Sequence, residues 1–285
     1  MATTVNSGFA KLRDNLEITT LQASTVSTRQ TNVRDAVKKE LTVLDDFLTG
    51  SYMRNTMIAP LKSADVDIFV VLDSSYYTQD GQAALLDRVK RVLRKTYTDT
   101  PDISRAGQAV TITFTDFKVD VVPAFNRQGG GYLIPDTIGK RWIGSDPKKH
   151  VSIWSDRNKA KNGQLVPVLK MLKCWNRENG GYFNSFYLET LALQVFDGIT
   201  ISNDWSGVRY FFDKAQSAVG AHLTDPAGYS SIRPPSDNDV KEIKSRLETA
   251  LQRARNAEAA EAAGKTEEAF RLWRLIFGDY FPAYG

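Results

Sequence analysis

The chain has 285 residues, of which 42% are hydrophobic and 11% aromatic, and these proportions are typical of a globular protein with one large domain or two small ones. Its 37 basic and 33 acidic residues are interspersed and give a net charge of +4, so we expect no strong binding to duplex nucleic acid. The lone cysteine, Cys174, excludes an internal disulfide and, with 2 histidines, a zinc site of the usual Cys/His type. Because the sequence has neither a long apolar run nor the pattern of a signal peptide, we expect a cytoplasmic protein that does not engage a membrane.

The N-terminal part of the chain predicts helix. Apolar residues recur there at spacings of four, four and three, which places them on one helix face: Val33, Val37, Leu41 and Leu44. We therefore expect helical structure over roughly residues 5–48, ended by Gly50.

The next segment changes to a strand pattern. Residues 65–72 are short, apolar and β-branched after two carboxylates, which predicts a core strand. A helix over about 80–96 follows, and residues 104–125 predict an antiparallel meander with tight turns at 106–107 and 115–116. The polar, glycine-rich stretch 126–144 is interpreted as a loop between two lobes.

The second half of the chain is predicted to be mostly helical. Helices are expected over 165–177 and 185–196, separated by a glycine pair at 180–181. Residues 224–236 contain three prolines and a glycine and predict a loop, and residues 237–277 predict two helices divided at Gly264.

Three aspartates are candidates for metal binding. Asp65 and Asp67 are two residues apart on one strand and share a face, while Asp120 lies among valines in a later strand. Carboxylates this close repel unless a cation lies between them, and three of them can hold two Mg²⁺ or Mn²⁺ ions for phosphoryl transfer. The alternative is that Asp65 caps the strand, Asp67 is a solvated edge residue and Asp120 pairs with Lys118 or another neighbour.

Gly50 and Ser51 are candidates for phosphate binding. They follow the predicted helix and precede the acidic strand, so a glycine turn and a hydroxyl could contact the triphosphate that the metal ions also hold. Taken alone, a Gly-Ser pair would be an ordinary helix end.

The glycine-serine and carboxylate motifs together resemble those of the polymerase-β-like nucleotidyltransferase superfamily. The motifs are Gly50-Ser51-Tyr52, Asp65-Val66-Asp67 with the strand that follows, and Val119-Asp120 with the Val-Val-Pro-Ala that follows. Further segments, including Leu172 to Asn176, Ser185 to Tyr187, Asp225 to Gly228 and Leu272 to Gly278, extend the resemblance over nearly the whole chain. Within the superfamily, the sequence is similar to the bacterial cyclic oligonucleotide synthases (CD-NTases), relatives of cyclic GMP-AMP synthase and oligoadenylate synthetase.

This resemblance implies an α+β fold in two lobes. Residues 1–145 would form the nucleotidyltransferase lobe with a mixed sheet, and residues 146–285 a helical lobe, similar to that of oligoadenylate synthetase, that completes the nucleotide pocket. It also implies that Lys173 contacts donor phosphates, that Ser185 joins it and that the Phe186 ring stacks on a base. The alternatives are a solvated helix face for Lys170 and Lys173 and a plain core position for Phe186.

The function implied by the resemblance is the joining of NTPs into a cyclic di- or trinucleotide second messenger in anti-phage defence, with pyrophosphate released. ATP is the expected substrate and GTP a candidate second one. A transferase that modifies RNA or protein and a non-catalytic nucleotide-binding member remain alternatives. The chain ends in Gly285, which is either an ordinary frayed end or a point of conjugation or contact for a regulatory protein, as in some relatives.

Overall fold

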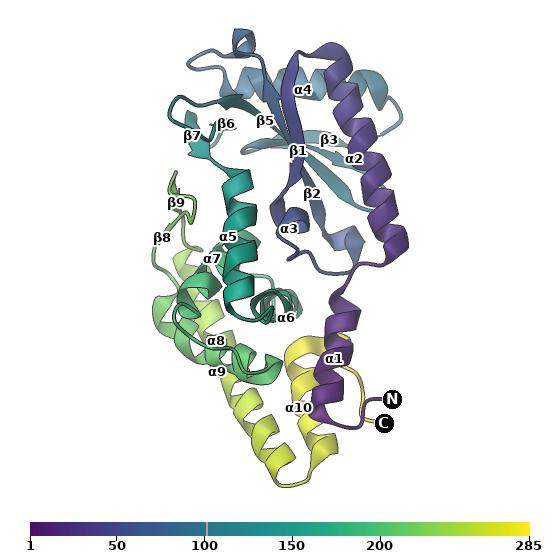
Figure 1. Ribbon diagram of the computed structural model, residues 1–285, viewed down its shortest axis with the longest axis vertical. Coiled ribbons are helices and arrows are strands. Elements are labelled where there is room, and N and C mark those ends of the chain that lie inside the picture. The colour runs from purple at the N-terminus through teal and green to yellow at the C-terminus, as the bar shows by residue number, and fades with distance from the viewer. Residues whose placement is uncertain (101) are drawn as a thin grey trace. The chain divides into compact units, whose positions relative to one another are not determined.

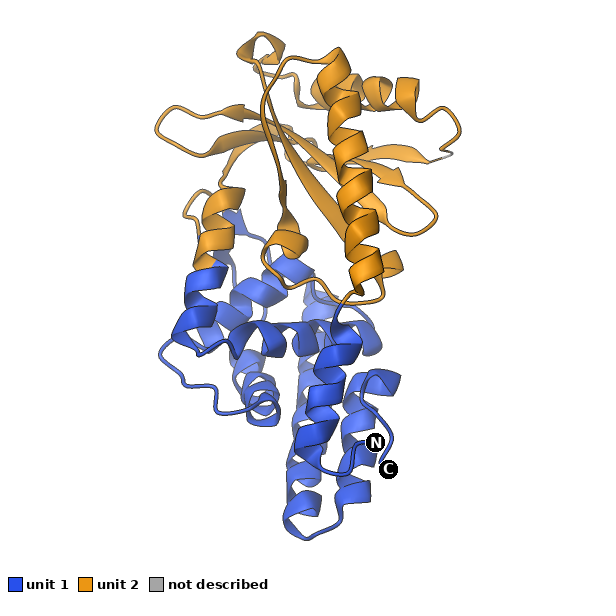
Figure 2. Cartoon of the chain, turned by 45° about the vertical axis from the view of Figure 1, so that its right-hand side comes forward, with its two compact units in different colours: residues 1–17, 154–226, 231–285 blue, residues 18–153, 227–230 orange. Residues whose placement is uncertain are grey.

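The computed structural model describes residues 1–100 and 102–285. They form two compact units (Figure 2). The sheet unit comprises residues 18–153 and 227–230, and the helical unit comprises residues 1–17, 154–226 and 231–285. The sequence placed the division at 145/146 and residues 1–17 with the sheet. In the structure, residues 1–17 belong to the helical unit, because helix α1 (Val5–Leu16) packs on helices from the second half of the chain.

The sheet unit is built on a mixed sheet. Its central strands are ordered β1-β2-β5-β4-β3, with β2 and β5 parallel and the other neighbours antiparallel. Strand β6 pairs antiparallel with the end of β5 and with β7. The bounds are β1 (Val43–Thr49), β2 (Asp65–Leu72), β3 (Ile103–Ala106), β4 (Ala109–Thr113), β5 (Lys118–Asn126), β6 (Tyr132–Asp136) and β7 (Arg141–Ser145).

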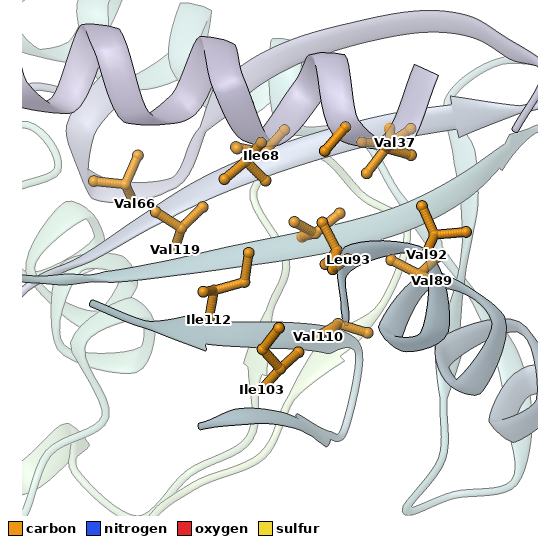
Figure 3. Close-up of a cluster of buried hydrophobic side chains, with 14 of the residues drawn as sticks. Val37, Val66, Ile68, Val89, Val92, Leu93, Ile103, Val110, Ile112 and Val119 are labelled. Atoms are coloured by element: carbon orange, nitrogen blue, oxygen red, sulfur yellow. The ribbon is translucent and has the colours of Figure 1, made fainter. Parts of the chain in front are cut away.

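Helices α2 (Thr20–Glu40) and α4 (Gln82–Thr96) cover one face of this sheet and enclose its main core (Figure 3). Alternate residues of β2, among them Val66 and Ile68, point into that core, together with Val119 of β5. The remaining residues of β2 therefore point to the opposite face, because side chains alternate along a strand. A short helix, α3 (Gly50–Met53), connects β1 to the segment before β2.

The helical unit is assembled from α1 and five later helices (Figure 1). These are α6 (Leu165–Glu178), α7 (Ser185–Val195), α8 (Asp204–Ala218), α9 (Asp237–Ala262) and α10 (Thr266–Phe277), with a two-residue hairpin of β8 (Leu223–Thr224) and β9 (Ser231–Ile232). The ring of Phe9 in α1 lies 4.9 Å from that of Trp273 and 5.2 Å from that of Phe281, so an aromatic cluster holds α1 in this unit. Helix α5 (Pro147–Ala160) begins in the sheet unit and ends in the helical unit.

Two predictions of local structure were wrong. Residues 43–49 form strand β1 and not the end of a long helix, because they pair with β2 from Val43 opposite Leu72 to Thr49 opposite Asp67. Leu44, predicted to lie on the apolar helix face, is 55% exposed. Residues 126–144 are not a loop, since they contain β6 and most of β7 in a hairpin. The predicted strand 65–72, the meander at 104–125 and the two helices divided at Gly264 are confirmed.

The C-terminal tail packs against the helical unit. Phe281 is fully buried, and the backbone N–H of Gly285 donates to the carbonyl oxygen of Ala2 at 3.2 Å. The terminal residues themselves are exposed, but they are tethered at both Phe281 and Gly285. Among the described residues, no helix is long and apolar enough to cross a membrane.

Candidate active site

The register of the two parallel strands β2 and β5 places the predicted carboxylates together. Asp67 is paired with Asp120, and Asp65 is paired with Lys118. Register partners on neighbouring strands point to the same face, and Asp65 shares that face with Asp67 because they are two residues apart. This is the face opposite α2 and α4, where Asp65 is exposed and Asp67 and Asp120 are half-buried. The sheet thus brings the three carboxylates to one surface.

The carboxylates of Asp65 and Asp120 influence each other electrostatically. Surrounding protein atoms desolvate the carboxyl group of Asp65 and raise its pKa; the negative charge of Asp120 raises that pKa further, while Lys118 opposes the shift. A raised pKa means that the charged form of Asp65 is disfavoured in the absence of a cation. A bound cation at this surface would therefore stabilise the charged form of Asp65.

Thr111 orients Asp120, and sequence reasoning missed it. Thr111 is the register partner of Asp120 on β4, and its hydroxyl donates to Asp120 Oδ1 at 2.6 Å. One oxygen of Asp120 is thereby engaged by the protein. The only signal in the sequence was the alternation of β4, which could not reveal the register.

Gly50 lies directly against Asp67. Thr49 at the end of β1 is the register partner of Asp67, and the chain turns at Gly50 with a φ of +65° to enter α3. A Cβ atom on Gly50 would lie 1.7 Å from Asp67 Oδ2, so only glycine leaves room for the carboxylate. Ser51 follows at once and is half-buried, and its carbonyl oxygen accepts the N–H groups of Thr56 and Met57 at 2.9 and 3.1 Å. The predicted glycine-serine motif and the predicted carboxylate strand therefore meet in space.

The donor set of this surface suits a hard divalent cation, because carboxylate oxygens are the ligands that Mg²⁺ and Mn²⁺ prefer. In residues 1–100 and 102–285 no three Asp, Glu, His or Cys side chains are gathered closely enough to enclose a metal ion. The fit rests on the face of the sheet that Asp65, Asp67 and Asp120 share, and on the desolvation of Asp65 to which the charge of Asp120 adds.

In the helical unit, Lys173 is paired with a glutamate. Its Nζ lies 3.2 Å from Glu189 Oε1, across the helices α6 and α7. Lys173 is 9% exposed and Glu189 is fully buried. Sequence reasoning missed Glu189, although an isolated acidic residue in the apolar helix 185–195 was a usable signal. The pair holds the Lys173 ammonium group in a defined place.

Lys170 has a different partner. Its Nζ lies 2.6 and 2.7 Å from the two carboxylate oxygens of Glu17, which follows α1. Neither Lys170 nor Lys173 is a solvated residue on a helix face, since both are buried. The alternative of snorkelled lysines on a solvated face is therefore excluded for both.

Ser185 and Phe186 open helix α7. Asn184 caps the helix, and its Oδ1 accepts the N–H groups of Phe186 and Tyr187 at 2.9 and 3.3 Å. Ser185 is exposed, while Phe186 is half-buried and stacks on the fully buried Trp154 with ring centroids 5.9 Å apart and planes 19° apart. Trp154 thus supports the Phe186 ring.

Comparison with known proteins identifies the class to which this fold and site belong. Residues 3–158 match the family described as "Second Messenger Oligonucleotide or Dinucleotide Synthetase domain", and the chain belongs to this family. The protein is a bacterial-type cyclic oligonucleotide synthase and thus a nucleotidyltransferase, as the sequence predicted.

Among curated proteins, the chain is similar to a cyclic AMP-AMP-AMP synthase of Acinetobacter sp. (strain ATCC 27244 / 9458). The two are 28% identical over 98% of this chain and 86% of the relative. A cyclic AMP-AMP-GMP synthase of Enterobacter hormaechei is 22% identical over 59% of this chain and 47% of that protein.

The fold is also that of solved enzymes. Escherichia coli MS115-1 CdnC, solved with ATP, superposes with a TM-score of 0.78 at 18% identity and covers 99% of this chain and 100% of that one. The same E. coli protein in complex with a HORMA protein gives a TM-score of 0.77 at 17% identity, over 98% of each chain. Vibrio cholerae DncV in its apo form gives 0.69 at 18% identity, over 83% of this chain and 69% of that one. The predicted fold class, an α+β nucleotidyltransferase lobe with a mixed sheet plus a helical lobe, is confirmed.

Proposed function

We propose that this protein uses divalent metal ions to join NTPs, with ATP among them, into a cyclic di- or trinucleotide. The observation that carries the proposal is the placement of Asp65, Asp67 and Asp120 on one face of the sheet, with the backbone of Gly50 against Asp67. The Acinetobacter relative is named for a product made of AMP units, and the E. coli CdnC structure was solved with ATP. Both names support ATP as a substrate.

In the proposed reaction, a ribose hydroxyl attacks the α-phosphate of an NTP and pyrophosphate leaves. Asp120 accepts the proton of the attacking hydroxyl, and the hydrogen bond from Thr111 to Oδ1 fixes the direction of its other oxygen. The Gly50-Ser51 turn contacts the triphosphate, because a turn without a side chain at Gly50 lets backbone and hydroxyl groups approach the phosphates. A second round of the same reaction closes the linear intermediate.

Asp65, Asp67 and Asp120 would hold Mg²⁺ or Mn²⁺. Two such ions, when bound, stabilise the negative charge that develops on the attacking and leaving oxygens. The fold holds Asp65 near enough to Asp120 for the negative charge of Asp120 to raise the pKa of Asp65, and bound cations would relieve this repulsion.

In the helical unit, we assign nucleotide contacts to Lys173, Ser185 and Phe186. Lys173 offers an ammonium group whose position is set by Glu189, and Ser185 offers an exposed hydroxyl at the start of α7. Phe186 offers the face of a ring that Trp154 holds from behind, so a base stacking there meets a rigid platform.

The direct experiment is product analysis. Purified protein is incubated with Mg²⁺ or Mn²⁺ and each combination of radiolabelled ATP, GTP, CTP and UTP, and products are identified by chromatography and mass spectrometry. We expect a cyclic product that contains AMP and is absent with EDTA. Linear products only, or label transferred to added RNA or to protein, would contradict the proposal and favour a transferase that modifies RNA or protein.

We further propose a signalling role in defence against phage and a regulatory protein partner. The E. coli CdnC relative was solved with a HORMA protein. For this chain, Gly285 is a candidate site of conjugation because it is exposed. Its backbone N–H group donates a hydrogen bond to the carbonyl oxygen of Ala2. Plaque assays with wild type and Asp65→Asn, Asp67→Asn cells test the defence role. Intact-mass analysis after coexpression with neighbouring genes tests the conjugation: an adduct linked to Gly285 supports it, and its absence contradicts it.

A further inference from the structure

A basic cleft of about 540 Å³ lies in the sheet unit, away from the carboxylates. It is formed by the end of β5, the turn that connects β5 to β6 and the first residues of α5. Figure 1 shows the β6–β7 hairpin leading directly into the N-terminal end of α5. Asp120 and Asn126 of β5 are six residues apart, which corresponds to about 20 Å along an extended strand. The cleft is therefore separate from the candidate active site.

Three cationic side chains line this cleft, and two of them have no carboxylate partner among the described residues. Lys148 Nζ lies 2.7 Å from Asp45 Oδ2. Within the described part of the chain, Arg127 and Lys149 form no ion pair: Lys149 Nζ donates to the carbonyl oxygen of Ala227 at 2.9 Å, and Arg127 contacts only neutral groups. The one acidic residue in the lining is Asp146, which caps α5 by accepting the Lys149 N–H at 3.0 Å. The lining thus has an excess of positive charge.

The position of the two lysines in helix α5 makes the excess positive charge energetically unfavourable. Lys148 and Lys149 lie in the first turn of α5, where the helix dipole disfavours positive charge. A bound anion would offset both the repulsion between the cations and their unfavourable interaction with the dipole.

The cleft is also preorganised. The Tyr229 ring lies between two of the cations, 5.4 Å from the Arg127 guanidinium carbon and 5.9 Å from Lys149 Nζ. The turn beside it closes through a hydrogen bond from the Arg127 N–H to the Gly131 carbonyl oxygen at 3.1 Å. Gly131 has a φ of +68°, and a Cβ atom there would lie 2.7 Å from the Tyr229 ring, so glycine is needed for this close packing.

We propose that this cleft binds the phosphate groups of a small molecule, with Arg127 and Lys149 as the principal contacts. Guanidinium and ammonium groups bind phosphate through charge-assisted hydrogen bonds. The volume of about 540 Å³ is in the range of pockets that hold small-molecule ligands. The phosphates can belong to a free polyphosphate or to a nucleotide. The proposal does not depend on the metal ions or substrates proposed above.

Isothermal titration calorimetry on the full chain in EDTA tests the proposal with three probes: inorganic tripolyphosphate, ATP and AMP. We expect tripolyphosphate or ATP to bind wild type, and binding to weaken about tenfold or more in the double variant Arg127→Ala, Lys149→Ala. Both side chains are exposed, so the variant should fold. Arg127→Lys, which keeps the charge, should stay within a few-fold of wild type.

Two controls separate this cleft from other causes. The double variant Arg91→Ala, Arg94→Ala removes the same charge from exposed positions of α4 and should bind like wild type. Ser51→Ala alters the candidate active site and should also leave this binding intact. Equal tripolyphosphate and ATP affinities would assign the ligand to free polyphosphate, and tighter ATP binding would assign it to a nucleotide. The proposal is overturned if no probe binds, if the Arg127 and Lys149 double variant binds like wild type, or if Ser51→Ala alone abolishes binding.

Discussion

Glu189, whose side chain is fully buried, lies 3.2 Å from the ammonium group of Lys173. A glutamate removed from water in this way requires its cation, because an unpaired buried charge is strongly unfavourable. Lys173 therefore has a structural role in the helical unit in addition to the nucleotide contact proposed for it. An activity measurement on Lys173→Ala alone cannot distinguish the two roles.

We expect Lys173→Ala to lower the free energy of unfolding by about 3 kcal/mol, because it removes the ammonium group 3.2 Å from the fully buried carboxylate of Glu189. Lys170→Ala should have a smaller effect, since its partner Glu17 has a side chain that is 54% exposed and can be hydrated. Urea denaturation of the two variants checks this difference. Equal losses of stability would show that burial of Glu189 has no special consequence.

The double variant Lys173→Met, Glu189→Gln separates stability from nucleotide use. It replaces the buried pair with neutral groups of similar size, so stability should return to near that of wild type. Nucleotide use should still fall roughly ten- to a hundredfold, because the charge-assisted contact with phosphate is lost. Initial rates as a function of ATP concentration provide the measurement. If the stable double variant turns over ATP like wild type, the assignment of Lys173 to the phosphates is wrong.

Gly50→Ala should nearly abolish activity. The new Cβ atom would lie 1.7 Å from Asp67 Oδ2 and must displace the carboxylate or the turn. Gly107→Ala is the matched control: Gly107 has a similar φ of +58°, and its Cβ would meet only the end of Ile138 at 3.9 Å. Both variants carry the backbone strain of about 1–2 kcal/mol, and only Gly50→Ala disturbs Asp67. A product assay and thermal unfolding of both variants test this; similar activities would separate Gly50 from the catalytic surface.

The double variant Asp65→Asn, Asp67→Asn should fold and make no product. Neutral amides of the same shape remove the repulsion at this surface, and they bind Mg²⁺ poorly. We expect stability within about 1 kcal/mol of wild type and a loss of activity of roughly a thousandfold or more. Thermal unfolding with and without Mg²⁺ and a non-hydrolysable ATP analogue should show stabilisation of wild type only. Product from the double variant, or no stabilisation of wild type, contradicts the metal assignment.

The pH dependence of stability should reveal the raised pKa of Asp65. In the folded protein, desolvation of its carboxyl group by neighbouring protein atoms and the charge of Asp120 favour the protonated form of Asp65. Its contribution to stability is therefore fully present below the pKa of the unfolded chain, near pH 4. That contribution is lost as the pH rises through the raised pKa. Asp65→Asn should therefore gain stability relative to wild type between about pH 4 and neutral pH, without metal. A difference between the two proteins that does not vary with pH would show that the raised pKa is absent.

The sequence by itself determined the central features of this protein. The alternation of residues 65–72 and 118–126 fixed two strands and the face of each carboxylate, because side-chain direction in a strand follows from local geometry. The segment 43–49 was mistaken for helix, since its apolar spacing also fits a helix and only pairing with β2 selects the strand. The hairpin at 126–144 was missed because the glycines at 129–131, in the turn before β6, dominate the local pattern, and only the pairing of β6 with β7 reveals the two strands.

Relationships between distant segments were decided only by the tertiary structure. The register that aligns Asp67 with Asp120, the hydrogen bond from Thr111 and the approach of Gly50 to Asp67 all join residues whose spacing in sequence carries no distance information. The partners Glu189 for Lys173 and Glu17 for Lys170 likewise depend on which helices pack together. The residue types therefore predicted the chemistry of the site. The positions of its charged groups, and the effects of those groups on one another, depend on packing between distant segments, which no local pattern encodes.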